Sequence, residues 1–344
     1  VIGSREIMLG YRFFDADALR HQIVAESVEI HGKPGTGYFV EGFPKPEWRP
    51  SDGGPVRLYE RYDERDPYCL GLDIATGEGS AWCAGVALNC RFNRTAAIID
   101  ADMRPDELAV QAYFLSRAYG NALIAPERNG IGFATLSTLQ TLTGNLFTHD
   151  DHGVGWLTDA KTRAELFSQL QREIAGRSTE LKDRALIEQC QATTMSKRGR
   201  PDPSPGFRGD LVIARGIAGM VRKLRGLSQA TSIVERIAGP INIRFAHTFT
   251  SEGLDLDYLS AYEGALHDTI GGYYDQGEIP ADSIIGLAYG DPLYDLNSTA
   301  GHEAFHHVER ALATEQELRI LNDPEELERM RAYAAPEIGG VTKG

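Results

Sequence analysis

Three acidic residues stand where predicted secondary-structure elements end or begin. Asp73 ends an expected strand, Glu127 follows another, and Asp210 begins a long expected helix. Strand ends and a helix start that are far apart in sequence can converge at one edge of a sheet. Carboxylates are the hard oxygen ligands that Mg²⁺ and Mn²⁺ prefer, and two such ions about 3.5–4 Å apart support phosphodiester cleavage. A single acid in such a place is usually a turn residue or a helix cap, so the hypothesis of a two-metal site depends on the joint placement.

Residues 302–306 form a second candidate site, with the pattern H-E-x-x-H. On a helix, His302 and His306 share one face and can bind one Zn²⁺, and Glu303 is then placed to polarise a metal-bound water. Two imidazoles need a further protein ligand, for which Glu317 is the first candidate. The remaining candidates are Glu326 and Glu328. The alternative is an ordinary helix with surface His and Glu side chains.

The elements around the first three acids follow a recognisable order. Strands are expected at 68–74, 82–89, 95–100, 122–125 and 146–148, and helices at 105–119, 131–142, 162–174 and 210–227. Three successive strands, then helix, strand, helix, strand and a late helix, argue for an α/β fold with a mixed sheet covered by helices. Ribonuclease H-like nucleases have this order. Upstream, the turn formers in 32–37 and 44–55 predict loops and a linker.

Four blocks of sequence, in order between about residues 55 and 227, resemble the nuclease domain of the large terminase subunit of tailed phages. They are residues 68–77, 119–132, 155–163 and 209–214. The resemblance implies a ribonuclease H-like fold in which Asp73, Glu127 and Asp210 bind two Mg²⁺ or Mn²⁺ ions. It also implies cleavage of double-stranded DNA during phage genome packaging, with the phage portal or the small terminase subunit as further partners.

The chain departs from that family's pattern at two places. The family often has Asp-Asp where this chain has Gly209 and Asp210, which could weaken a second metal ion or its water shell. It also often has an Asp where Ala81 precedes Trp82, which could alter the turn near the site. The order G-x-x-x-x-G-K-[ST] does not occur, so no ATPase motor and no ATP hydrolysis are expected from this chain.

Residues 271–274 and 301–306 resemble zincin-like domains found in large proteins of phages and mobile elements. This resemblance implies a second, smaller α+β domain with the H-E-x-x-H helix. The run 284–289 is then expected to be the edge strand that binds substrate backbone in such peptidases. Phe305 and Val308 are expected to face the core, so that both histidines point outward.

Several basic residues near the acidic blocks are candidates for binding DNA phosphates by charge. They are Arg128, Lys161, Arg163, Lys197, Arg198 and Arg200. Residues 197–200, which prolines follow, predict a mobile basic loop that touches DNA. The alternative for all of these residues is solvated surface charge.

The charge of the 344-residue chain is uneven. It has 35 Lys and Arg against 49 Asp and Glu, a net charge of −14, which is unfavourable for coating nucleic acid without specificity. Residues 236–344 contain 7 of the bases and 19 of the acids. We therefore expect an N-terminal segment and linker at 1–60, the nuclease domain at 61–235 and the zincin-like domain at 236–344.

Composition also bounds the setting and the rival functions. The four cysteines form no Cys-x-x-Cys pair and no disulfide framework, and no apolar run approaches the length of a membrane span. A cytoplasmic setting is expected, that of the host cell for a phage protein. Two rivals to the endonuclease stay open: a zinc metallopeptidase whose nuclease-like part only binds DNA or partners, and a non-catalytic assembly module of a packaging complex.

Overall fold

The computed structural model describes most of the first two thirds of the chain and parts of the last third. The described residues are 12–29, 32–74, 82–130, 132–149, 153–196, 199–238, 242–246, 249–250, 269–270, 272–275, 284–288, 296–308 and 312. The chain divides into two compact units, residues 1–224 and 225–344, and the division falls inside helix α6 (Asp210–Ala238). None of the helices in the described part has the length and apolar content that a membrane crossing requires.

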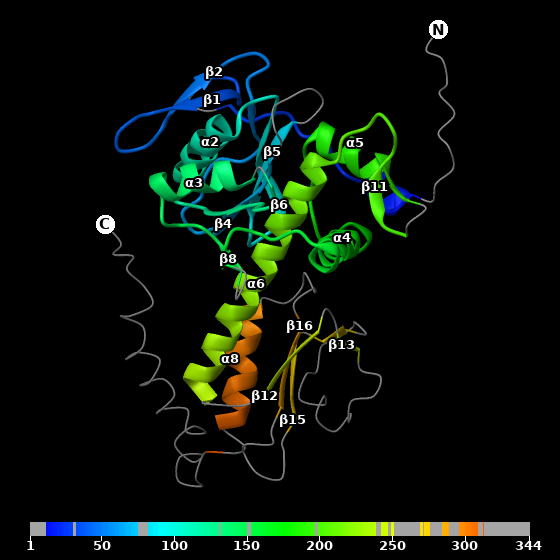
Figure 1. The fold of residues 1–344 in the computed structure, drawn as a ribbon. Coiled ribbons are helices and arrows are strands. Elements are labelled where there is room, and N and C mark those ends of the chain that lie inside the picture. Colours follow the sequence, from blue (N-terminus) through cyan, green and yellow to red (C-terminus); the bar gives the residue numbers. More distant parts are fainter. Residues whose placement is uncertain are drawn as a thin grey trace. The chain divides into compact units, whose positions relative to one another are not determined.

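The first unit is built on a seven-stranded mixed sheet with the order β2-β1-β3-β6-β5-β4-β7 (Figure 1). The strands are β1 (Thr36–Val40), β2 (Glu47–Pro50), β3 (Val56–Leu58), β4 (Tyr68–Asp73), β5 (Cys83–Asn89), β6 (Arg94–Ala101) and β7 (Leu123–Pro126). β4, β5 and β6 are successive antiparallel strands, and β7 pairs in parallel with β4. Parallel strands need a crossover, which helix α2 (Pro105–Ala118) provides between β6 and β7.

Helices cover both faces of this sheet, because its side chains alternate between two apolar cores. Leu70 and Leu72 of β4 belong to the core shared with α2 and α3 (Gly132–Leu142). Cys69 of β4 and Ala84 of β5 belong to the core shared with α6. The other helices of the α6 core are α1 (Ala16–Arg20), α4 (Ala160–Ala175) and α5 (Arg184–Ala192). Two short hairpins complete the unit: β8 (Thr148–His149) with β9 (Gly153–Val154), and β10 (Thr193–Met195) with β11 (Pro201–Pro203).

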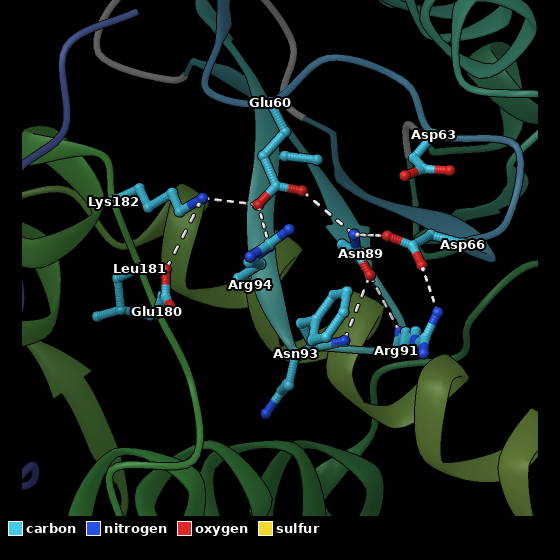
Figure 2. A network of polar contacts seen from close by, with 12 residues as sticks. Glu60, Asp63, Asp66, Asn89, Arg91, Asn93, Arg94, Glu180, Leu181 and Lys182 are labelled. Carbon is cyan, nitrogen blue, oxygen red and sulfur yellow. Dashed lines mark hydrogen bonds and ion pairs between the residues drawn. The ribbon is translucent and has the colours of Figure 1, made fainter.

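A polar network holds the loops around the start of β4 and the end of β5 (Figure 2). Glu60 is at its centre: it pairs with Arg94 and accepts from Lys182 Nζ at 2.6 Å. Asn89 Nδ2 donates to Glu60 Oε2 at 3.2 Å and to Asp66 Oδ2 at 2.8 Å. The network lies at the end of β4 opposite to Asp73, so we assign it to stability and not to the candidate site.

The described part of the second unit contains a three-stranded sheet and a helix. β16 (Ile284–Ala288) is the central strand, parallel to β12 (Asn242–Ala246) and antiparallel to β15 (Gly272–Asp275). β13 (Phe249–Thr250) pairs with β14 (Thr269–Ile270). Helix α8 (Leu296–His307) packs Ala300 and Ala304 against Ile285, Leu287 and the Val234 side chain of α6.

The predicted α/β class is confirmed: the strand order and directions from β4 to β7, with helices on both faces, are those of a ribonuclease H-like mixed sheet. The interpretation of residues 32–37 and 44–55 as loops and linker was wrong in part, because β1 begins at Thr36 and β2 lies within the second range, and both strands extend the sheet. Helix α6 is also longer than expected and continues to Ala238.

Candidate active site

Asp73 and Glu127 lie next to each other because they end neighbouring parallel strands. Leu72 of β4 is opposite Pro126 of β7, and the N–H of Glu127 donates to the Leu72 carbonyl at 3.0 Å. Asp73 follows Leu72 and is the last residue of β4. Glu127 follows Pro126 and comes directly after β7. Each of these two residues keeps some solvent-accessible surface, although protein atoms surround the carboxyl group of Asp73. The sequence prediction that these two strand ends meet at one sheet edge therefore describes the backbone correctly.

Helix α6 brings Asp210 to the same edge, and Gly71 makes the close approach of the helix possible. A Cβ on Gly71 would lie 2.2 Å from the carbonyl oxygen of Ala214 and 2.6 Å from the nitrogen of Ala218. Both are backbone atoms of α6, so any side chain at this position would push the helix away. Asp73 is two residues after Gly71 and so faces the same side of the sheet as α6. Asp210 is the first residue of this helix.

The three carboxyl groups interact electrostatically. Burial raises the pKa of Asp73 well above its ordinary value, and the negative charge of Glu127, a hydrogen bond between these two side chains, and the charge of Asp210 raise it further. Arg163 acts in the opposite direction. A hydrogen bond between two carboxyl groups needs a proton on one of them. The raised pKa of Asp73 therefore favours the protonated form of this carboxyl group.

In kind and number, these residues fit a divalent cation. They offer three hard oxygen donors at one sheet edge, where burial and neighbouring negative charge raise the pKa of Asp73. Within the described ranges, however, no three His, Cys, Asp or Glu side chains surround a common point as metal ligands.

The loop after Glu127 is fixed by short contacts. Asn129 Nδ2 donates to the Thr158 carbonyl at 2.5 Å and lies 3.4 Å from Glu127 Oε1. A Cβ on Gly132 would lie 2.1 Å from the Glu127 carbonyl oxygen, so α3 can begin directly beside the acid only with glycine there. These contacts give a physical reason why the sequence block at residues 119–132 contains Glu127, Asn129 and Gly132 together.

Sequence reasoning missed two charged residues beside this site, Arg208 and Asp100. Arg208 Nε donates to Asp210 Oδ2 at 3.0 Å, and its Nη2 donates to Asp100 Oδ1 at 2.5 Å. Asp100 is on β6, in the row of the sheet that contains Ala84 and Asp73. The alternation of buried residues in β6 was the available signal, because Ile98 belongs to the α6 core and Asp100 follows two residues later.

The six candidate DNA-binding residues differ in their surroundings. The positive charge of Arg163 lowers the pKa of Asp73, and Arg163 Nη2 donates to Asp202 Oδ1 at 3.2 Å. Arg128 follows Glu127 directly and is partly exposed, and Lys161 is exposed at the start of α4. Arg200 is exposed and pairs with Asp202 at 3.0 Å. Lys197 and Arg198 lie outside the described residues.

The H-E-x-x-H residues lie on helix α8, as predicted. His302 Nε2 and His306 Nε2 are 3.0 Å apart, and the rings meet edge to face with centroids 4.5 Å apart. Glu303 is buried. The carboxylate candidates Glu317, Glu326 and Glu328 lie outside the described residues.

Two expectations for this part of the chain were wrong. The expected edge strand is β16, which is the central strand of its sheet and pairs on both sides. Its backbone groups are therefore already used within the sheet. Phe305 is 42% exposed and does not face the core. The buried side of α8 is formed by Glu303, His307 and the small residues Ala300 and Ala304, and the two alanines allow the helix to lie close to its neighbours.

Comparison with known proteins gives similarity in structure only. No protein-family model matches the chain, and no curated protein matches it in sequence. Among solved structures, the large terminase nuclease of the thermophilic phage G20c with bound magnesium is similar, with 14% identity and a TM-score of 0.45 over 59% of this chain and 94% of that one. The same nuclease with bound cobalt has a TM-score of 0.44 at 14% identity, with the same coverage. The large terminase nuclease domain of Thermus phage P74-26 is 13% identical, with a TM-score of 0.41 over 58% of this chain and 91% of that one.

Proposed function

We propose that this protein is a divalent-metal-dependent endonuclease that cuts double-stranded DNA. The observation that supports it most directly is the meeting of Asp73, Glu127 and Asp210 on the α6 side of one sheet edge, where burial and then the charges of Glu127 and Asp210 raise the pKa of Asp73. Like charges held this close are stabilised by a cation.

Asp73, Glu127 and Asp210 would hold Mg²⁺ or Mn²⁺, two ions in all. When bound, such ions supply an activated water and stabilise the leaving oxygen of a phosphodiester. The protein contributes the fixed positions of the three carboxylates. Arg163 and Arg128 provide positive charge beside them, and Lys161 adds another at the start of α4. Their role is to bind DNA phosphates and orient the strand toward the acids.

We place this activity in phage genome packaging. The four sequence blocks that resemble terminase nucleases support this setting, because they include the three acids and the residues that fix them. The partners are then double-stranded DNA and the phage portal or small terminase subunit, and the protein acts in the host cytoplasm. The rival assembly-module function predicts the same partners without cleavage.

The test is nicking of supercoiled plasmid DNA with Mg²⁺ or Mn²⁺ as the only divalent ion. Asp73→Asn, Glu127→Gln and Asp210→Asn should each lower the rate by a factor of at least about 10²–10³, because each removes a charge from the cation site. Chelation with EDTA should stop cleavage by the unaltered protein.

Asp106→Asn is the matched control, because Asp106 is an exposed acid on α2 that pairs with Arg104. It should cleave at the unaltered rate. Cleavage at that rate by any two of the three site variants would refute the proposed function. Failure of the unaltered protein to cut DNA in either metal would favour the assembly-module rival.

We also propose that α8 binds Zn²⁺ through His302 and His306. Their Nε2 atoms are 3.0 Å apart, and two nitrogens about 2.0–2.1 Å from one zinc ion have nearly this separation. Glu317 is the proposed third ligand, and Glu303 is the proposed base for a metal-bound water. The central position of β16 does not favour the peptidase alternative, so peptidase activity is an outcome of the test and not part of the proposal.

Zinc content after growth with added zinc tests this second site. Unaltered protein should contain close to one zinc per chain, and His302→Ala or His306→Ala should lose it. His21→Ala, at the end of α1, should keep it. Casein hydrolysis that stops in Glu303→Gln with zinc retained would establish the peptidase alternative. Zinc-free unaltered protein would overturn zinc binding.

A further inference from the structure

Arg208 connects the candidate active site to the sheet behind it. Its guanidinium donates from Nε to Asp210 Oδ2 at 3.0 Å and from Nη2 to Asp100 Oδ1 at 2.5 Å. The same group lies over the ring of Trp82, 4.2 Å from the ring centroid. Three partners from separate parts of the chain thus fix one side chain, which is only 29% exposed.

Asp100 is itself firmly anchored, with a side chain that is only 8% exposed. Its backbone N–H donates to the Pro55 carbonyl at 2.9 Å, and its second oxygen, Oδ2, accepts from Arg57 Nη2 at 3.2 Å. Arg57 Nε in turn donates to Asp183 Oδ2 at 2.8 Å. Asp183 is buried and caps helix α5 through the N–H of Leu186. The bridge from Asp210 therefore ends in the interior of the unit and not in solvent.

We propose that Arg208 is a positioning residue that sets the orientation of the Asp210 carboxylate for the divalent cation, an inference that depends on the proposed function. A guanidinium is planar and presents its N–H groups in a rigid fork. The contacts with Asp100 and Trp82 therefore also fix the direction of the Nε–H group that donates to Asp210. By holding Oδ2 of Asp210, Arg208 assigns Oδ1 to the cation. The carboxylate can then no longer turn about its last side-chain torsion.

The charge of Arg208 is compatible with a neighbouring cation because Asp100 balances it. The Arg208–Asp100 pair brings one positive and one negative charge, so it orients Asp210 without adding net positive charge at the site. Bonds of this kind behind a metal ligand affect metal affinity or activity by about 10- to 100-fold.

Mn²⁺ binding without DNA, measured by titration calorimetry, tests the proposal apart from catalysis. Arg208→Gln and Asp100→Asn should each weaken Mn²⁺ binding by about 10- to 100-fold. The Mn²⁺ concentration for half-maximal plasmid nicking should rise in parallel, and excess Mn²⁺ should restore much of the rate. Arg208→Lys should restore part of the affinity, because an ammonium can reach one carboxylate but does not form the planar bridge.

Arg49→Gln is the matched control, because Arg49 is an exposed arginine on β2 that pairs only with Glu47 among the ion pairs of the described residues. It should bind Mn²⁺ as the unaltered protein does. Circular dichroism will show whether Arg208→Gln is folded. If it is not, the Mn²⁺ affinities of Asp100→Asn and Arg208→Lys test the proposal instead.

The outcomes separate the two proposals. Unaltered protein that neither binds Mn²⁺ nor nicks DNA removes the proposed function, and this inference with it. If the unaltered protein does both and Arg208→Gln binds Mn²⁺ equally well, only the positioning role is refuted. Tighter Mn²⁺ binding by Arg208→Gln would also refute it, because the guanidinium would then compete with the cation.

Discussion

Arg215 and Glu173 form an ion pair inside the α6 core. Arg215 Nη2 lies 2.9 Å from Glu173 Oε2, and the side chains are 0% and 3% exposed. The same Nη2 atom also donates to Asn93 Oδ1 at 2.9 Å and to Thr179 Oγ1 at 2.7 Å. Burial alone would raise the pKa of Glu173, but the positive charges of Arg215 and Arg222 lower it below its ordinary value. Glu173 is therefore ionised in the folded protein.

Glu173→Gln should destabilise the protein by about 3–5 kcal/mol at neutral pH, because it leaves a buried guanidinium without its counter-charge. The pKa of Glu173 is lower in the folded than in the unfolded state, so its ionisation stabilises the fold above the unfolded pKa. That contribution is lost as the pH falls through the folded pKa. The stability difference between the unaltered protein and Glu173→Gln should consequently shrink under acidic conditions.

Urea unfolding at a series of pH values between about 3 and 7 measures this difference. Glu165→Gln is the control, because Glu165 is exposed on the same helix, α4. It should change stability by less than about 0.5 kcal/mol at every pH. A Glu173→Gln difference that stays constant down to pH 3 would contradict the lowered pKa.

At the scale of elements, the contact between β4 and α6 decides whether the acids meet. Gly71→Ala would place a methyl group 2.2 Å from a helix carbonyl oxygen, and backbone atoms cannot rotate away as a flexible side chain can. We expect a loss of about 1–3 kcal/mol or more in the free energy of unfolding. Under the proposed function, a displaced helix would also carry Asp210 away from Asp73 and weaken Mn²⁺ binding.

Gly144→Ala provides the comparison for this variant, since a Cβ at Gly144 would meet no heavy atom within 4 Å. Its stability and Mn²⁺ affinity should match those of the unaltered protein. Denaturant unfolding and calorimetry on both variants separate the effect of the close approach from a general effect of replacing glycine. Equal behaviour of the two variants would mean that α6 does not depend on Gly71 for its position.

At the scale of the whole molecule, the sequence predicts the central part of the first unit well. Its strands and helices have strong periodic patterns, and the order of elements alone indicates how β4 to β7 pair. The positions of Asp73 and Glu127 follow from that pairing. The contact between Arg208 and Asp100 could not be predicted from the sequence. These residues are 108 positions apart, and only tertiary packing brings them together.

The parts that sequence reasoning missed share a physical cause. β1 and β2 lie among glycines and prolines that are typical of loops, and they join the sheet only because β1 pairs with β3 on one side and with β2 on the other. β16 has the composition of any buried strand, which does not reveal whether it lies at an edge or at the centre. The apolar character of Phe305 favours a place in the core, but Glu303, His307, Ala300 and Ala304 occupy the buried side of α8.

The order in which the chain is synthesised gives the position of Asp210 a consequence for timing. Asp73 and Glu127 emerge from the ribosome well before helix α6, which begins at Asp210. At about 5–20 residues per second, the segment from Asp73 to Asp210 takes on the order of ten seconds to make. A nascent chain during that interval has two of the three acids and no helix to complete the set. Under the proposed function, nuclease activity would therefore begin only after Asp210 has been translated, so the order of the residues in the chain would itself delay cleavage.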